Sequence, residues 1–326
     1  MPLGVSVVAD TVAEIEGEHV TMSASERQIL LSRWIQPSST DEKVQQDRAG
    51  RMVADAVSVH PVFAGSTVKT YTKGSYPNNT NVRRDSDVDV VVEMHDLAYW
   101  GFNSNVDDKS AQGNPYKGDW TPDRWRSEVV RAMVSVFGAS DVDTSGKIAI
   151  NIKAVPGSRP SADVVPSFLY YRYNDANRSQ KLADQGSCVF PQGSTTKVVN
   201  WPQQQLDMGK AKNSATGGRY KYYARALKNA ENTLANDGLI DELPSYLMEC
   251  LAFNVPDGVL TRGTLDTGFR DTLSHMWASL TDGTADQTWV EPNWQKYLFR
   301  DTQQKWAIED GKVLVRATWN YLGYAS

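Results

Sequence analysis

The stretch that decides the fold is KGSYPNNTNVRRDSDVDVVVEM, residues 73–94. Gly74 and Ser75 end a short predicted strand, and a polar, turn-rich segment leads from them to a run of valines. Charged and apolar residues alternate within that run, so the sequence predicts a largely buried strand with Asp87 and Asp89 on one face. Two carboxylates about 7 Å apart along a strand repel each other, and a bound divalent cation is the simplest compensation.

Each part of this stretch has an ordinary structural explanation when it is taken alone. A Gly-Ser pair after a strand is usually a turn, and two aspartates at a strand edge usually form a solvated face. The ordered combination of strand, Gly-Ser, polar loop and strand-borne Asp-X-Asp is much more specific, and it favours a metal and phosphate site. Asp85 alternates in phase with the two aspartates, so spacing alone does not exclude it as a ligand.

The rest of the chain divides into a mixed half and a helical half near Trp201. Capping signals and apolar periodicity predict the elements on both sides of that point. The predicted helices cover residues 40–60, 122–137, 219–236, 244–254, 263–281 and roughly 295–320. The predicted strands cover residues 68–73, 87–94, 147–155, 161–165 and 168–173, and residues 101–120 and 174–196 are expected to be loops. These patterns favour an α+β fold.

The amino-acid composition of the chain excludes several classes of protein function. The chain has 326 residues, 40% of them hydrophobic, which is enough for about two domains with packed cores. Its net charge of −5 argues against binding long nucleic acid by counterion release. Its two cysteines and four histidines show no zinc-ligand spacing, which fits a reducing cytosol. The first residues lack a basic leader and no stretch approaches 18 apolar residues, so we expect a cytoplasmic protein without membrane contact.

Residues 73–94 resemble the metal-binding stretch of polymerase β-type nucleotidyltransferases, and more narrowly that of the bacterial cGAS/DncV-like enzymes. The resemblance extends over roughly residues 70–95 and 160–257, and it is greatest to clade E of that family. The other segments that carry it are SADVVPSFLYYRY (161–173), VVNWPQQQLDMGKAKN (198–213), RYKYYARALKNAEN (219–232) and LPSYLMECLAFNVPD (243–257). It implies a polymerase β-like core, a small twisted mixed sheet with N-terminal helices, in residues 1–200. A C-terminal helical domain, residues 201–326, is expected to close the nucleotide cleft.

The resemblance also implies an activity, which is cyclic dinucleotide synthesis for antiphage (CBASS-type) defence. In the family a 3′-hydroxyl, or a 2′-hydroxyl, attacks the α-phosphate of a nucleoside triphosphate, pyrophosphate leaves, and a second transfer closes the ring. Several clade E members incorporate uridine, so the expected substrate is UTP, alone or with ATP. We expect a monomer whose product is read by a separate effector protein. The zinc-binding insertion of the animal relatives has no counterpart here, so activation by long double-stranded DNA is not expected.

The family's metal site implies three aspartate ligands. The resemblance places Asp87 and Asp89 as the first two and Asp163 as the third, and it makes Asp85 a loop residue before them. From the residues alone, Asp141 and Asp143 are equally good choices for the third ligand. The three carboxylates are expected to hold two Mg²⁺ ions, with Mn²⁺ as a substitute, because such ions stabilise both oxygens of an in-line displacement.

Five further residues are expected to contact the nucleotide, four at the phosphates and one at the base. Gly74 and Ser75 are expected to offer backbone N–H groups and a hydroxyl to the phosphates. The resemblance adds Lys228 and Ser245 as phosphate contacts and Tyr246 as the ring that stacks on the donor base. Without the resemblance, Lys228 would be assigned to the solvated face of an amphipathic helix.

Asn200 is the expected base-reading residue, since in the clade an asparagine in this segment accompanies pyrimidine use. An amide can pair with both the N3–H and a carbonyl of uracil. The alternative is that Asn200 is only a turn residue before Trp201 and Pro202. Two functional alternatives also stay open. One is a nucleotidyltransferase that modifies an RNA end, a protein or a small molecule, and the other is an inactive nucleotide-binding regulator.

Overall fold

The valine-rich stretches form the middle of one mixed sheet in the computed structural model. The structure describes residues 22–82, 87–104, 106, 116–175, 177–300 and 304–324, so Asp85 lies outside the described residues. The strands are β1 (Val68–Thr72), β2 (Val88–Phe102), β3 (Val142–Asp143), β4 (Ile150–Ile152), β5 (Ala162–Tyr173), β6 (Asp184–Val189) and β7 (Val198–Asn200). Their order is β1-β2-β5-β4-β3, while β6 pairs with β5 and β7 with β6. Only β2 and β5 run parallel among these pairs.

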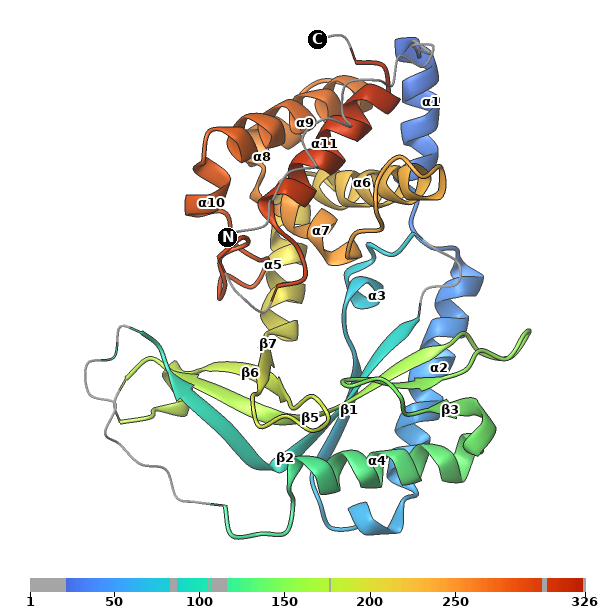
Figure 1. Ribbon diagram of the computed structural model, residues 1–326, viewed down its shortest axis with the longest axis vertical. Helices are drawn as coiled ribbons and strands as arrows, with labels where there is room; N and C mark the ends of the chain where they lie inside the picture. The colour runs from blue at the N-terminus through green and yellow to red at the C-terminus, as the bar shows by residue number, and fades with distance from the viewer. Residues whose placement is uncertain are drawn as a thin grey trace, which may run out of the picture.

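The central strand β2 is covered on both faces. Its apolar face packs on α2 (Thr40–Ser58) and α4 (Pro122–Phe137), which lie along the sheet in Figure 1. The opposite face carries Asp89 near the start of the strand, and beyond it Val91 and Glu93 are buried as well. Central parallel strands are usually buried on both faces, which explains the nearly continuous valine run.

Local capping signals set the ends of the two helices under the sheet. Ser39 and Glu42 form the expected capping box at the start of α2. Thr121 caps α4, Pro122 occupies its first turn, and the helix ends at Gly138, whose φ is +83°. Both predictions are confirmed, because each depends on hydrogen bonds between residues only a few positions apart.

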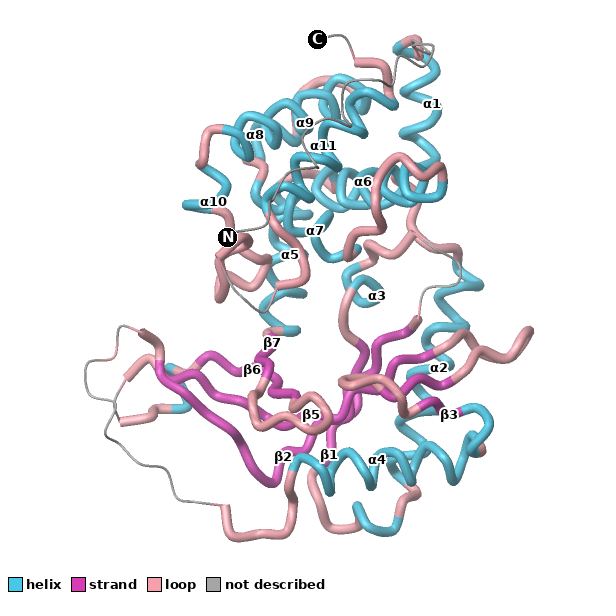
Figure 2. Tube along the Cα trace, in the orientation of Figure 1, coloured by secondary structure: helices cyan, strands magenta, loops and turns pink. Residues whose placement is uncertain are grey.

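The second unit is a bundle of helices above the sheet in Figures 1 and 2, with a core of its own. Its helices are α1 (Ala24–Trp34), α5 (Pro202–Ala215), α6 (Arg219–Asn236), α7 (Ser245–Asn254), α8 (Asp257–Leu260), α9 (Leu265–Thr281), α10 (Thr284–Thr288) and α11 (Ile308–Tyr321). The first helix, α1, packs on this bundle and not on the sheet. Its Leu31 and Trp34 are buried in the bundle, against α6 and α9. No helix in the described part of the chain is long and apolar enough to cross a membrane.

Two predictions about the sheet are corrected by long-range pairing. The strands expected at 161–165 and 168–173 are one continuous strand, β5, which runs through Pro166 opposite Val92 of β2. The polar segment 174–196, expected to be a loop, contains β6, which pairs with β5. In both places the neighbouring strand supplies a pairing partner that local propensity does not reveal.

The last predicted helix is shorter than expected. Among the described residues of the range 295–320, only those from Ile308 onward are helical. Before it, Val290 and Tyr297 form an isolated antiparallel bridge around a turn in which Trp294 has a φ of +56°. This compact turn breaks the helical periodicity that the apolar residues suggest.

Candidate active site

The parallel pairing of β2 with β5 brings the predicted carboxylates together. Asp89 lies directly opposite Asp163 in the strand register, so both side chains point to the same face of the sheet. Neighbouring strands are about 4.8 Å apart, and Asp87 precedes Asp89 by two residues on that face. The three aspartates selected from the sequence therefore form one acidic cluster at the start of these two strands.

Two of the three carboxylates already accept hydrogen bonds. Asp87 Oδ1 accepts one from the hydroxyl of Ser161, and Asp163 Oδ1 accepts one from Asn151 Nδ2 at 2.9 Å. Among the described residues these bonds use only one oxygen of each carboxylate, which leaves the second oxygen for a cation. Ser161 and Asn151 were not selected from the sequence, because each is far along the chain from the carboxylate it contacts.

The surroundings of Asp89 disfavour its ionised form. Burial raises its pKa above the ordinary value, and the negative charges of Asp163 and Asp87 raise it further. The ammonium of Lys73 opposes this increase, and its Nζ lies 3.8 Å from Asp89 Oδ1. The cluster thus concentrates negative charge that a single partly exposed lysine offsets incompletely.

The cluster has the ligand chemistry for a hard divalent cation. In the described part of the chain no three His, Cys, Asp or Glu side chains are already gathered tightly enough to enclose an ion. Burial and the charges of Asp163 and Asp87 nevertheless raise the pKa of Asp89, so a cation between the three carboxylates would relieve their repulsion. Mg²⁺ takes only a few carboxylates from a protein, together with waters and substrate phosphates, and this donor set fits that preference.

The Gly74-Ser75 turn lies against the same cluster. Gly74 has a φ of +76°, and a Cβ at this position would lie 2.7 Å from Asp89 Oδ2. The turn is fixed to β2 by a backbone hydrogen bond from Lys73 N–H to the Asp89 carbonyl, 3.0 Å. Both the backbone angle and the close approach to Asp89 therefore require glycine.

A cavity of about 560 Å³ opens beside this turn, between the sheet unit and the helix bundle. Four of the predicted site residues line it, namely Ser75, Asp87, Lys228 and Ser245. Lys305 also lines the cavity and adds a second cation there. Sequence reasoning missed Lys305, since it lies outside the segments that resemble the family and no motif surrounds it.

Lys228 is buried, so the alternative of a solvated helix face is wrong for it. Only 3% of its side chain is exposed, and its Nζ lies 2.6 Å from Glu249 Oε1 of α7. The same Glu249 oxygen accepts a hydrogen bond from the hydroxyl of Thr80, also at 2.6 Å. Lys228, the expected phosphate contact, is thus held in a buried ion pair at the wall of the cavity.

Asn200 and Tyr246 do not line this cavity in the described structure. Asn200 ends β7 and pairs with Ser187 of β6, and the alternation of side chains through β6 and β5 puts it on the face of the sheet that carries Asp163. The hydroxyl of Tyr246 lies 3.5 Å from Glu291 Oε2, and burial raises its pKa well above the ordinary value.

A second cavity, of about 500 Å³, adjoins the turn on its other side. Lys73 and Gly74 belong to its wall, which continues along β1 and β2 to Glu93 and is closed by the first turns of α5. Glu93 is buried there and accepts hydrogen bonds from Tyr71 (3.0 Å) and from the His95 ring (2.7 Å). Gly74 therefore borders this second cavity, while its neighbour Ser75 borders the first.

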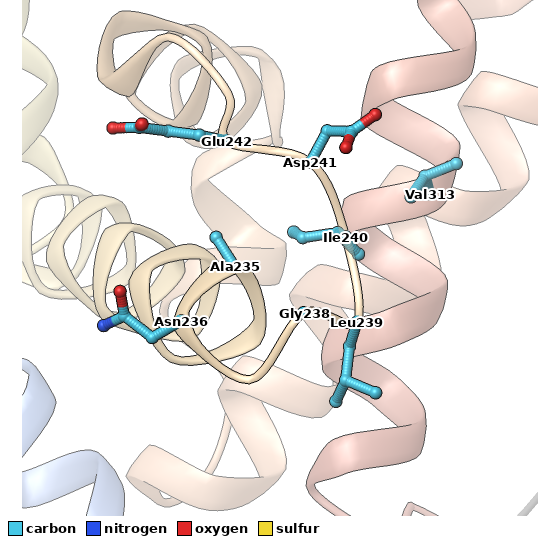
Figure 3. Close-up of a pocket in the computed structure, with 8 residues that line it drawn as sticks. All are labelled: Ala235, Asn236, Gly238, Leu239, Ile240, Asp241, Glu242 and Val313. Carbon is cyan, nitrogen blue, oxygen red and sulfur yellow. The ribbon is translucent and has the colours of Figure 1, made fainter.

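A third cavity, of about 740 Å³, is a less suitable site. Figure 3 shows its wall, which is the turn after α6, with Leu239 and Ile240, and Val313 of α11. Its charged side chains are Asp241 and Glu242, both acidic, and it shares only Glu242 with the cavity beside Ser75. Two carboxylates without a lysine or arginine would repel an anionic triphosphate.

Comparison with known proteins points to one family. Residues 207–323 match the model of the cGAS/DncV-like nucleotidyltransferase C-terminal helical domain. The chain is 32% identical to the cyclic dipyrimidine nucleotide synthase CdnE of Legionella pneumophila over 294 residues, which covers 89% of this chain and 96% of that protein. It is 30% identical to the cyclic UMP-AMP synthase of Rhodothermus marinus, with 88% of this chain and 94% of that protein covered.

Solved structures agree with these relatives. The structure of the Rhodothermus marinus CdnE c-UMP-AMP synthase with Apcpp and Upnpp matches with a TM-score of 0.78 at 27% identity, covering 92% of this chain and 98% of that one. The Elizabethkingia meningoseptica CdnE cyclic dinucleotide synthase with GTP and Apcpp matches with a TM-score of 0.73 at 25% identity, covering 91% and 99%. Both structures contain nucleoside triphosphates or their analogues.

Proposed function

This chain belongs to the bacterial cGAS/DncV-like nucleotidyltransferases of the clade E type, and from that premise we propose that it makes a cyclic dinucleotide. A nucleotide 3′-hydroxyl, or 2′-hydroxyl, attacks the α-phosphate of a bound nucleoside triphosphate and pyrophosphate leaves. The linear product binds again, and a second transfer closes the ring. The observation that carries the proposal is the in-register pair of Asp89 and Asp163, which lies beside the Gly74-Ser75 turn.

The metal site of the proposal consists of Asp87, Asp89 and Asp163. When bound there, two Mg²⁺ ions, or Mn²⁺ in their place, activate the attacking hydroxyl and neutralise the leaving pyrophosphate. The raised pKa of Asp89 supports this assignment, because burial and, after it, the negative charges of Asp163 and Asp87 disfavour the ionised carboxylate without a cation. No protein nucleophile is needed, because positioning and charge stabilisation supply most of the rate in such transfers.

The cavity of about 560 Å³ is the proposed triphosphate site. Ser75 and Ser245 offer hydroxyl groups there, and Lys228 and Lys305 offer ammonium groups. The cavity of about 500 Å³ on the other side of Gly74 gives room for a second nucleotide, as a reaction that joins two of them requires. Tyr246 remains the proposed partner of the donor base, although the described structure directs its hydroxyl toward Glu291.

We propose UTP as a substrate, either with ATP or with a second UTP. The relatives support a pyrimidine, since the named products are a cyclic dipyrimidine in Legionella pneumophila and cyclic UMP-AMP in Rhodothermus marinus. A relative from Elizabethkingia meningoseptica, 28% identical, is a cyclic dipurine nucleotide synthase, so base choice varies among proteins of this similarity. Asn200 is the proposed base-reading residue, because its amide carries the donor and acceptor that uracil requires.

The biological role follows from the proposed product. We propose that the enzyme acts as a monomer and that a separate effector protein of an antiphage (CBASS-type) system binds the cyclic dinucleotide. The experiment that tests the function incubates the protein and Mg²⁺ with each labelled triphosphate, singly and in pairs. A phosphatase-resistant product from UTP, or from UTP with ATP, supports the proposal. Label transferred only to an added RNA, protein or small molecule contradicts it and favours another nucleotidyltransferase.

A further inference from the structure

Glu249 of α7 contacts a hydroxyl group as well as the ammonium group of its buried ion pair with Lys228. Glu249 is 2% exposed, and its Oε1 accepts two hydrogen bonds of 2.6 Å, from Lys228 Nζ and from Thr80 Oγ1. These donors come from different parts of the chain, since Lys228 lies on α6 and Thr80 follows the Gly-Ser turn. One carboxylate oxygen therefore joins α6, α7 and the turn segment.

The segment from Ser75 to Thr80, which begins with the short helix α3 (Ser75–Asn78), is itself closed by Thr80. The Thr80 backbone N–H donates to the carbonyl of Ser75 at 3.0 Å, so the two ends of the segment 75–80 are fixed to each other. On α7, Glu249 lies four residues after Ser245, which places both on the same side of that helix. Ser75, Ser245 and Lys228 all line the cavity of about 560 Å³, and Glu249 is connected to each of them through the segment, the helix or the ion pair.

Charge and hydrogen-bond capacity explain what this arrangement achieves. A buried ammonium group is costly unless a counter-charge accompanies it, and Glu249 supplies that charge to Lys228. An ammonium group has three N–H donors, and one of them is directed to Glu249. The ammonium is thereby held in one place at the cavity wall, and its other donors, which have no partner among the described residues, can bind a ligand.

We propose that Glu249 is a positioning residue. It fixes Lys228 Nζ relative to Ser75, so that the Lys228 ammonium and the Ser75 hydroxyl contact the same triphosphate. The inference rests on the proposed function, because it treats Lys228 as a phosphate contact. The proposal predicts the direction in which the affinity for the triphosphate changes when Glu249 loses its charge. The triphosphate is anionic, so an effect of Glu249 by charge alone weakens its binding, whereas positioning strengthens it.

The test measures binding of a non-hydrolysable triphosphate analogue with Mg²⁺, and turnover, in Glu249→Gln. Gln keeps the size of the side chain but removes its charge. We expect binding to weaken at least threefold and kcat to fall at least tenfold, although a negative charge has been removed. Binding that is unchanged or tighter, with kcat within threefold of the parent, overturns the proposal. The matched control is Asp266→Asn, which breaks the Arg27–Asp266 pair (2.9 Å) within the helix bundle and outside the residues that line the cavity, so both readouts stay at parent values.

A double-mutant cycle keeps the test decisive if the single variant folds poorly. Lys228→Met combined with Glu249→Gln leaves a neutral pair, which avoids an unpaired buried charge. If Glu249 acts through Lys228, the double variant binds the analogue as weakly as Lys228→Met alone, and independent effects that multiply overturn the proposal. If the parent binds the analogue but forms no cyclic product, the proposed function fails while the binding cycle still tests Glu249. A parent that does not bind the analogue contradicts both.

Discussion

Replacing Asp89 with asparagine should remove catalysis and, without Mg²⁺, make the protein more stable. The side chain keeps its size in Asp89→Asn, but the charge that repels Asp163 and Asp87 is lost. The ion pair between Lys73 Nζ and Asp89 Oδ1, 3.8 Å, is lost as well. Which of these two effects is larger decides the sign of the change in stability.

The magnitudes favour stabilisation. Carboxylates on adjacent strands are separated by about 5 Å, where two charges repel by about 0.8 kcal/mol in water and about 3 kcal/mol at an effective dielectric of 20. The Asp89 side chain is 41% exposed, so the lower value applies more closely, at about 1 kcal/mol. The partly exposed pair with Lys73 is worth about 0–1 kcal/mol, and burial of the charged carboxyl adds to the cost of keeping it. The net gain is about 0.5–1 kcal/mol, or about 1–4 °C in Tm.

The pH dependence of the Tm difference between parent and variant shows whether the charge on Asp89 causes it. A raised pKa in the folded state means that the stability contributed by the protonated Asp89 is present at low pH and is lost as pH rises through that pKa. Parent and Asp89→Asn should therefore have nearly equal Tm below about pH 3.9, with the variant becoming the more stable as pH rises above it. Adding Mg²⁺ at neutral pH should stabilise the parent more than the variant.

The assay is thermal unfolding between pH 3 and pH 8, with and without Mg²⁺. The control is Asp119→Asn, a surface carboxylate paired with Arg124 and 87% exposed, whose stability should change by less than about 0.5 kcal/mol. If Asp89→Asn is less stable than the parent at neutral pH without Mg²⁺, the ion pair with Lys73 outweighs the repulsion between the carboxylates, and the claim that a cation is needed to relieve that repulsion is refuted.

Three further predictions address the site. Asp163→Asn should lower the rate at least about a hundredfold with the fold intact, and an unaffected rate would move the third ligand to another residue, with Asp141 and Asp143 the next to test. Gly74→Ala should slow turnover strongly, because the new Cβ lies 2.7 Å from Asp89 Oδ2 at a φ of +76°; parent-like kinetics would contradict this. Asn200→Ser should reduce UTP incorporation about 5- to 100-fold relative to purines, since a lost amide pair costs about 1–3 kcal/mol. An unchanged product ratio from four equimolar triphosphates would leave Asn200 with only a structural role at the end of β7.

Features that depend on nearby residues could be predicted from the sequence. The capping boxes and the Thr121 cap involve hydrogen bonds over three or four positions, and the helices they begin are where the sequence places them. The alternation around Asp87 and Asp89 also follows from local geometry. The family resemblance was needed to choose Asp163, because nothing local distinguishes it from other strand carboxylates.

Features that depend on distant residues could not be predicted. The pairing of β5 with β2 continues the strand through Pro166, and the packing of Leu31 draws α1 into the helix bundle. Lys305 reaches the cavity from a segment without a recognisable motif. The contact between Lys228 and Glu249 joins two helices, so neither helix alone reveals that the lysine is buried.

The most direct test of the central claim is the stoichiometry of the reaction. The protein is incubated with Mg²⁺ and the four triphosphates, and pyrophosphate and phosphatase-resistant product are measured together. We expect about two pyrophosphates for each cyclic dinucleotide that the parent makes. The Asp87→Ala/Asp89→Ala variant should still fold and should release neither pyrophosphate nor cyclic product. Pyrophosphate release without a phosphatase-resistant product, or parent-like synthesis by the double variant, would contradict it.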